Sequence, residues 1–220
     1  MGIFTCIYGI SKFIGWLTTK GIHKKEKFNV AFIGRGGTGK THLIKGIFGK
    51  EARIEEFEGC IKYEGSTYSN ISAWEMPKFV HGNAVKYYEE NQLVIFDLII
   101  VVSQATLGTD EEKLLFEAKK QKLPVILVRS KCDNDDLENF KIVKNTFNVN
   151  QEAALKLVRH LTTKFEESLT FSQLSNIPTF FVSAVAFQKG VGNLQQHTYF
   201  QEREFLHCLK ETAAKKFYYY

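Results

Sequence analysis

Short apolar runs alternate along the chain with longer stretches in which apolar residues recur every three or four positions. A continuous run such as 98–102 is typical of a strand buried on both faces of a parallel sheet, whereas the spacing in 151–167 is typical of an amphipathic helix. The pattern predicts strands at 28–33, 70–76, 98–102, 124–129 and 178–182, and helices at 40–48, 110–122, 151–167 and 201–215. This alternation indicates an α/β fold in which helices cover both faces of a mostly parallel sheet. In such folds ligands bind at the carboxyl ends of the strands.

The loop after the first predicted strand carries a phosphate-binding pattern. Residues 34–41 fit G-x-x-x-x-G-K-[ST] and lie between a strand and a helix. Glycines let the backbone wrap a phosphate with its N–H groups, and the helix N-terminus adds positive potential. Lys40 is expected to reach the β- and γ-phosphates and the Thr41 hydroxyl to ligate Mg²⁺, which makes both candidate catalytic residues. The predicted nucleotide contacts here are Gly34, Arg35, Gly36, Gly37, Thr38, Gly39, Lys40, Thr41 and His42.

Two later loops favour guanine as the base. Residues 130–133, Ser-Lys-Cys-Asp, follow a predicted strand where GTP-binding proteins carry [NT]-K-x-D. The Asp133 carboxylate would accept two hydrogen bonds from guanine, whereas adenine would leave this charge poorly paired. The Lys131 stem would cover the face of the base. Ser183 and Ala184 follow the last predicted strand, and the Ala184 N–H would meet the guanine oxygen. The predicted ligands are therefore GTP or GDP with Mg²⁺.

The order of these motifs resembles the immunity-related GTPases, the interferon-inducible p47-type group. Its members carry W-D-L-P-G and then a string like V-R-T-K-V-D-S-D; this chain has Trp-Glu-Met-Pro-Lys at 74–78 and Val-Arg-Ser-Lys-Cys-Asp-Asn-Asp at 128–135. The resemblance covers roughly residues 27–190. It implies a P-loop NTPase fold of the Ras-like G-domain type, assembly with itself or with related GTPases through that domain, and action at intracellular membranes in host defence. Members usually carry a further helical domain, so the resemblance also predicts a short relative or a partial product.

The third motif departs from the family pattern. Glu75 replaces the aspartate that holds Mg²⁺ through water; it keeps the charge one methylene further out and is the second candidate metal residue. Lys78 replaces a glycine and loses its freedom to swing, although its ammonium could contact phosphate oxygens. Thr67 is the only threonine between His42 and Trp74, and nothing marks it as the threonine of a first switch. After Lys78, the nearest candidate to orient the attacking water is His81.

Three hypotheses follow from these departures. Phosphoryl transfer depends on positioning and charge, so nucleotide binding can survive where turnover fails. The first hypothesis is slow or assembly-dependent GTP hydrolysis. The second is a non-hydrolysing GTP-binding module that modulates related GTPases. The third is an ATP-using phosphate-loop kinase, against which Lys131 and Asp133 argue.

Composition narrows the alternatives. The chain has 220 residues, 44% of them apolar, with 29 Lys+Arg against 24 Asp+Glu. This excludes a disordered chain, and a net charge of +5 is too mild to make nucleic acid the expected partner. The four cysteines lack metal-ligand spacing and are expected to be free thiols in a reducing compartment.

The two ends suggest contact with a membrane. Residues 3–17 have apolar positions at helical spacing, too few for a span, and four lysines precede the first acid, Glu26. This pattern is typical of a basic amphipathic helix on a membrane surface. The Met1-Gly2 start, with Cys6 where serine or threonine is preferred, partly matches an N-myristoylation signal at Gly2. We therefore expect a membrane-facing segment at 1–26, a GTPase domain at 27–215 and an aromatic tail at 216–220, in a cytoplasmic protein peripheral to intracellular membranes.

Overall fold

The computed structural model describes residues 27–57, 59–80, 82–135, 151–168, 174, 176–188 and 200–218. Its strands are β1 (Phe28–Ile33), β2 (Arg53–Phe57), β3 (Cys60–Glu64), β4 (Ile71–Glu75), β5 (Leu98–Ser103), β6 (Val125–Arg129) and β7 (Thr179–Phe181). Its helices are α2 (Lys40–Phe48), α3 (Ala84–Glu90), the 3-10 turn η1 (Leu93–Ile95), α4 (Thr109–Lys120), α5 (Cys132–Asp135), α6 (Gln151–Ser168), α7 (Ala184–Gln188) and α8 (Glu202–Tyr218).

The strands form one mostly parallel sheet, in the order β2-β3-β4-β1-β5-β6-β7. The pairs from β4 to β7 are parallel, while β3 runs antiparallel to both β2 and β4. The α/β fold predicted from the sequence is confirmed. Because β1 lies near the middle of the sheet, the loop that follows it opens at the centre of the carboxyl edge.

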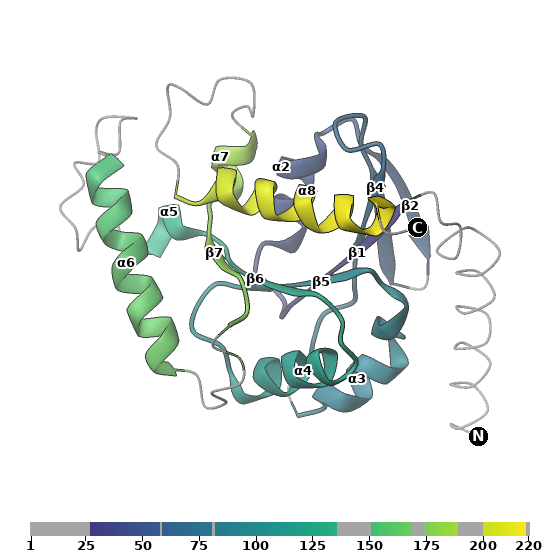
Figure 1. Cartoon of the computed structure of the whole chain (residues 1–220), viewed down its shortest axis with the longest axis horizontal. Coiled ribbons are helices and arrows are strands. Elements are labelled where there is room, and N and C mark those ends of the chain that lie inside the picture. The colour runs from purple at the N-terminus through teal and green to yellow at the C-terminus, as the bar shows by residue number, and fades with distance from the viewer. Residues whose placement is uncertain are drawn as a thin grey trace.

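Helices cover both faces of the sheet, as predicted. Helices α2, α7 and α8 lie on one face, and α3 and α4 lie on the other (Figure 1). Successive side chains of β1 and β5 point to opposite faces. Val30 and Ile100 belong to an apolar cluster that includes residues of α2 and α8, whereas Ala31 and Ile99 belong to a second cluster that includes residues of α3, α4 and α6. Both central strands are therefore buried on two sides, which explains their unbroken apolar sequence.

A β-hairpin at one edge of the sheet differs from the sequence prediction. The sequence pattern predicted no strand over residues 53–64, but Glu55 and Glu56 belong to β2, which pairs with β3. The prediction was wrong because an edge strand with a solvated face needs few apolar residues. Tyr63, in β3, is buried on the opposite face of this hairpin from Lys62, whose ammonium lies over the Trp74 ring.

The C-terminal helix extends beyond its predicted end at residue 215, to Tyr218. Lys216 connects this helix to the sheet. The Lys216 Nζ lies 2.7 Å from Oδ2 of Asp97, the residue before β5, and the same oxygen accepts the Asn29 N–H from β1 at 2.8 Å. The predicted membrane segment at 1–26, with Gly2 and Cys6, lies outside the described residues. Within the described part of the chain, no helix is both long and apolar enough to cross a bilayer.

Candidate nucleotide-binding site

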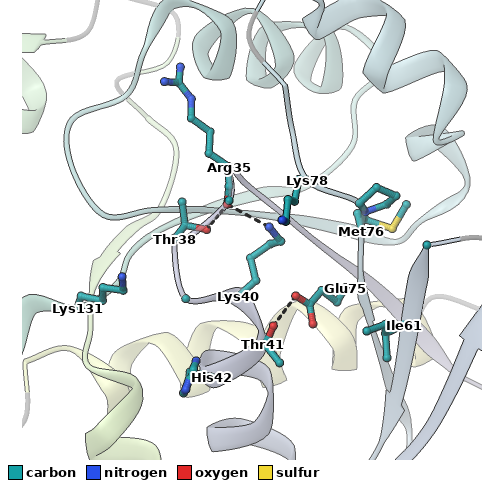
Figure 2. Close-up of a pocket in the computed structure, with 15 residues that line it drawn as sticks. Arg35, Thr38, Lys40, Thr41, His42, Ile61, Glu75, Met76, Lys78 and Lys131 are labelled. Atoms are coloured by element: carbon teal, nitrogen blue, oxygen red, sulfur yellow. Dashed lines mark hydrogen bonds between the residues drawn. The ribbon is translucent and has the colours of Figure 1, made fainter.

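A cavity of about 490 Å³ opens where β1 and β4 end and α2 begins. Figure 2 shows Lys40 in the middle of its lining, with Lys78 next to it and Lys131 further to one side. Its lining brings together most of the predicted phosphate and metal residues with part of the third motif. The residues that line it are Arg35, Gly36, Gly37, Thr38, Gly39, Lys40, Thr41, His42, Gly59, Ile61, Glu75, Met76, Pro77, Lys78 and Lys131.

Two glycines shape the phosphate loop. Gly39 caps α2 in the left-handed region, with a φ of 86°, where a side chain would be strained. Gly34 lies against β5, and an added Cβ would overlap the carbonyl oxygen of Val102. These positions require glycine, which is why the motif specifies it at both ends of the loop.

Lys40 is buried, although it carries a charge. Its side chain is 6% exposed, and its Nζ donates to the carbonyls of Gly34 at 2.7 Å and Arg35 at 3.3 Å. Burial lowers the pKa of the Lys40 ammonium, Glu75 opposes that shift, and Lys78 adds to it. An ammonium has three N–H donors. Two face the loop, so the third is left for an anion in the cavity.

Glu75 contacts Thr41, the other predicted metal residue. The Thr41 hydroxyl donates to Glu75 Oε1 at 2.6 Å, and the Tyr63 hydroxyl donates to Oε2 at 3.0 Å. Burial raises the pKa of the Tyr63 hydroxyl, and the charge of Glu75 raises it further. A hydroxyl and a carboxylate are oxygen donors of the kind that Mg²⁺ binds, usually together with water and phosphate. Thr41 and Glu75 therefore fit the predicted metal, which would neutralise charge on a bound triphosphate.

Tyr63 was missed by the sequence reasoning, and its role can be tested. We expect Tyr63→Phe to weaken Mg²⁺ binding to the nucleotide-loaded protein about 10-fold, because Glu75 loses the hydroxyl that orients it. A Mg²⁺ titration of nucleotide release measures this. Tyr88→Phe is the matched control: among the described residues, the buried Tyr88 hydroxyl has no hydrogen-bond partner. Equal metal affinity in the two variants would contradict the role of Tyr63.

The loop of residues 130–133 lies against the phosphate loop. The buried Ser130 hydroxyl contacts the Thr38 carbonyl, and Gly39 lies beside the Lys131 side chain. Lys131 has a left-handed backbone, with a φ of 60°, and its Nζ donates to Gln104 Oε1 at 2.9 Å. The serine that replaces the usual Asn or Thr thus ties the two predicted loops together.

The remaining guanine candidates lie beyond Lys131. The Cys132 N–H donates to the Val182 carbonyl at 3.2 Å, which brings residues 130–133 next to Ser183 and Ala184. Asp133 is half-buried in α5, and Ala184 begins α7. Asp133, Ser183 and Ala184 are not among the described residues that line the phosphate cavity. The structure therefore places the predicted phosphate contacts and the predicted base contacts in two adjoining parts.

Two acidic residues hold these loops and were not predicted. Glu111 accepts Arg35 Nη2 at 2.8 Å and the Gly108 N–H at 3.1 Å. The Arg35 guanidinium therefore points away from Lys40 (Figure 2). Arg35 contributes its backbone, and not its side chain, to the phosphate loop. The only sequence feature that marked Glu111 was the acidic start of the predicted helix at 110–122.

The second is Glu202, which is 2% exposed at the start of α8. Its Oε1 accepts the Ser183 N–H at 2.7 Å, while its Oε2 has no hydrogen-bond partner among the described residues. Burial raises the pKa of the Glu202 carboxyl to about 7 against the opposing pull of nearby backbone N–H groups. No sequence pattern singled this residue out.

The sheet order, the phosphate loop and the adjoining base loops define a phosphate-loop NTPase of the G-domain class. A family model described as Interferon-inducible GTPase (IIGP) matches residues 17–191. The chain belongs to this interferon-inducible GTPase family, which confirms the resemblance drawn from its motifs.

Individual proteins agree with this assignment. Interferon-gamma-inducible GTPase 10 of Mus musculus is 26% identical over 147 residues, 62% of this chain and 35% of the relative. Immunity-related GTPase family M protein 2 of Mus musculus is 23% identical over 170 residues, 72% of this chain and 40% of the relative. The chain thus spans well under half the length of both. Translation elongation factor SelB from Methanococcus maripaludis, in its apo form, shares the fold with a TM-score of 0.51 and 16% identity, over 86% of this chain and 33% of that one.

Proposed function

We propose that this protein is a membrane-associated GTP-binding protein that hydrolyses GTP slowly or on self-assembly, with Mg²⁺ as its metal. One observation carries the proposal: the buried Lys40 ammonium is directed into a cavity next to a paired hydroxyl and carboxylate, Thr41 and Glu75. A buried cation beside an oxygen-donor pair suits a phosphate anion and its divalent metal. Membership in a family of GTPases supports the same chemistry.

Guanine is the base we propose for the adjoining loop. Ser130 links residues 130–133 to the phosphate loop, and Cys132 links them to Val182, which directly precedes Ser183 and Ala184. A base bound beside Lys131 would therefore lie next to Asp133, whose carboxylate complements the guanine edge.

Membrane attachment and assembly rest on other support. The basic amphipathic pattern at 3–17 and the partial myristoylation signal at Gly2 favour a peripheral place on an intracellular membrane. Assembly with a second copy or with a related GTPase is proposed from family membership.

A non-hydrolysing GTP-binding module is the second candidate function. The backbone around Lys78 favours this second candidate, because the residues on both sides of Lys78 are held by hydrogen bonds. The Phe79 N–H donates to the Gly34 carbonyl at 3.2 Å, and the Tyr87 hydroxyl donates to the Pro77 carbonyl at 2.8 Å. A segment fixed in this way has little freedom to move when a γ-phosphate arrives or leaves. Turnover separates the two candidates.

The test is nucleotide binding and turnover by the purified protein with Mg²⁺, over a range of protein concentrations, with ATP as the comparison. Tight GTP binding, with GDP release that rises faster than linearly with protein concentration, supports an assembling GTPase. Binding without GDP release supports the second candidate. Equal affinity for GTP and ATP would overturn both.

An Asp133→Asn variant tests the choice of base. We expect it to lose GTP affinity about 10-fold or more, because the amide offers an N–H donor where guanine also presents a donor. Xanthine carries a carbonyl at that position, so the variant should bind xanthosine triphosphate better than the wild type does. Competition binding with both nucleotides measures the change. GTP affinity that is unaltered in the variant would contradict the role of Asp133.

A further inference from the structure

The segment of residues 76–79 is fixed against the phosphate loop. The Met76 N–H donates to the Phe32 carbonyl at 3.0 Å, and the Phe79 N–H donates to the Gly34 carbonyl at 3.2 Å. The Phe79 ring is buried, 5.1 Å from the Tyr87 ring in an edge-on arrangement. This segment therefore presents the residue between Pro77 and Phe79 to the cavity in a defined position.

That residue is Lys78, and its side chain lies over the phosphate loop. A Cβ placed on Gly36 would be 3.5 Å from Lys78 Cδ, so the stem is in contact distance of the loop backbone. Lys78 lines the cavity, and its ammonium lies near that of Lys40 (Figure 2). The positive charge of Lys78 also contributes to the lowered pKa of Lys40.

The other cations that line the cavity have protein partners. Arg35 is held by Glu111, Lys40 donates to two carbonyls, and Lys131 donates to Gln104. In the described part of the chain, no hydrogen bond or ion pair engages the Lys78 ammonium. An exposed cation close to a second cation is a favourable site for an anion.

The position of Lys78 indicates which phosphate it would meet. Lys131, which belongs to the predicted base-binding residues 130–133, and Lys78 lie on opposite sides of Lys40 (Figure 2). The same order holds along the loop, where Gly39 lies beside Lys131 and Gly36 lies beside Lys78. A nucleotide whose base lies near Lys131 therefore extends its phosphate chain past Lys40 towards Lys78.

We propose that the Lys78 ammonium binds the terminal phosphate of a bound triphosphate. The inference rests on the proposed function, since it needs a guanine nucleotide in this cavity. Where a glycine would offer only a backbone N–H, Lys78 adds a charge. The protein then distinguishes GTP from GDP through an ion pair with the γ-phosphate, a contact that requires no movement of the segment that carries Lys78.

The test compares a non-hydrolysable GTP analogue with GDP in binding to Lys78→Met, which keeps the apolar stem and removes the charge. We expect affinity for the analogue to fall about 10-fold and affinity for GDP to change less than about 2-fold, as the loss of one charge-assisted hydrogen bond implies. Lys78→Arg should keep most of the preference. Lys86→Met, on the exposed face of α3, is the control for net charge, since Lys86 pairs with Glu90 outside the cavity.

An equal loss of both affinities in Lys78→Met would overturn the terminal-phosphate assignment, and so would no loss of either. A wild-type protein that binds neither nucleotide would instead refute the proposed function. The two failures are therefore distinguishable.

Discussion

Lys40→Met is expected to bind guanine nucleotides at least about 100-fold more weakly than the wild type while remaining folded. The variant removes the buried ammonium that faces the phosphates, and a charge-assisted contact in a largely dry site is worth several times an exposed one. Methionine matches the length of the stem, so the loss is mainly electrostatic.

Stability without nucleotide should respond differently. Burial lowers the pKa of Lys40, so its surroundings disfavour the charged form. Methionine relieves that penalty, and we expect the nucleotide-free variant to melt no lower than the wild type. Melting with and without GTP and Mg²⁺ measures both effects. A variant that the nucleotide still stabilises as strongly as the wild type would contradict the role assigned to Lys40.

The parts of the fold and site that follow from the sequence depend on local pattern. The unbroken apolar run of β5 indicated a strand buried on both faces, and the glycines before Lys40 indicated the phosphate loop. Both signals are carried by consecutive residues, so no tertiary information was needed. Thr41 was a metal candidate from the phosphate-loop motif and Glu75 from the family resemblance, and the structure places the two in contact at the carboxyl edge of the sheet.

The parts that do not follow depend on pairing across the chain. Strand β2 carries Glu55 and Glu56 and lacks a strong apolar pattern, so it is recognised only by its pairing with β3. Tyr63 was missed for the same reason, since its reach to Glu75 depends on that hairpin. Ser130 was predicted as a variant of the base motif, but its contact with Thr38, 92 residues earlier, could not be predicted from either segment alone.

The residues at the start of α8 show how such pairing supports the end of β7 and the candidate guanine contacts that follow it. The Gln201 N–H donates to the Phe181 carbonyl at 3.0 Å, and the Gln201 side-chain oxygen accepts the Phe181 N–H at 3.0 Å. Glu202 then accepts the Ser183 N–H at 2.7 Å. Gln201, just before α8, and Glu202, its first residue, thus fix the end of β7 and the residues that lead to the candidate guanine contact at Ala184.

Glu202→Gln should therefore stabilise the protein at alkaline pH and have little effect at acidic pH. In the folded protein burial raises the pKa of Glu202 to about 7, above the ordinary value of 4.5. The folded state binds the extra proton between these pH values, so this group's contribution to stability is complete below about pH 4.5 and is lost as the pH rises through 7. By pH 8 the raised pKa of this buried carboxyl costs the folded state about 3 kcal/mol of stability relative to acidic pH. Glutamine keeps an oxygen for the Ser183 N–H and does not ionise.

Chemical unfolding of both proteins between pH 4.5 and pH 8 measures the difference, and groups common to both cancel in it. We expect the two free energies of unfolding to be similar at the acidic end and to separate as the pH rises, with the variant the more stable. Glu89→Gln, at an exposed position on α3, should follow the wild-type curve throughout. Parallel curves for Glu202→Gln and the wild type would mean that Glu202 is not held neutral against Ser183. In that case the hydrogen bond between Glu202, at the start of α8, and the Ser183 N–H would not depend on the protonation of this carboxyl group.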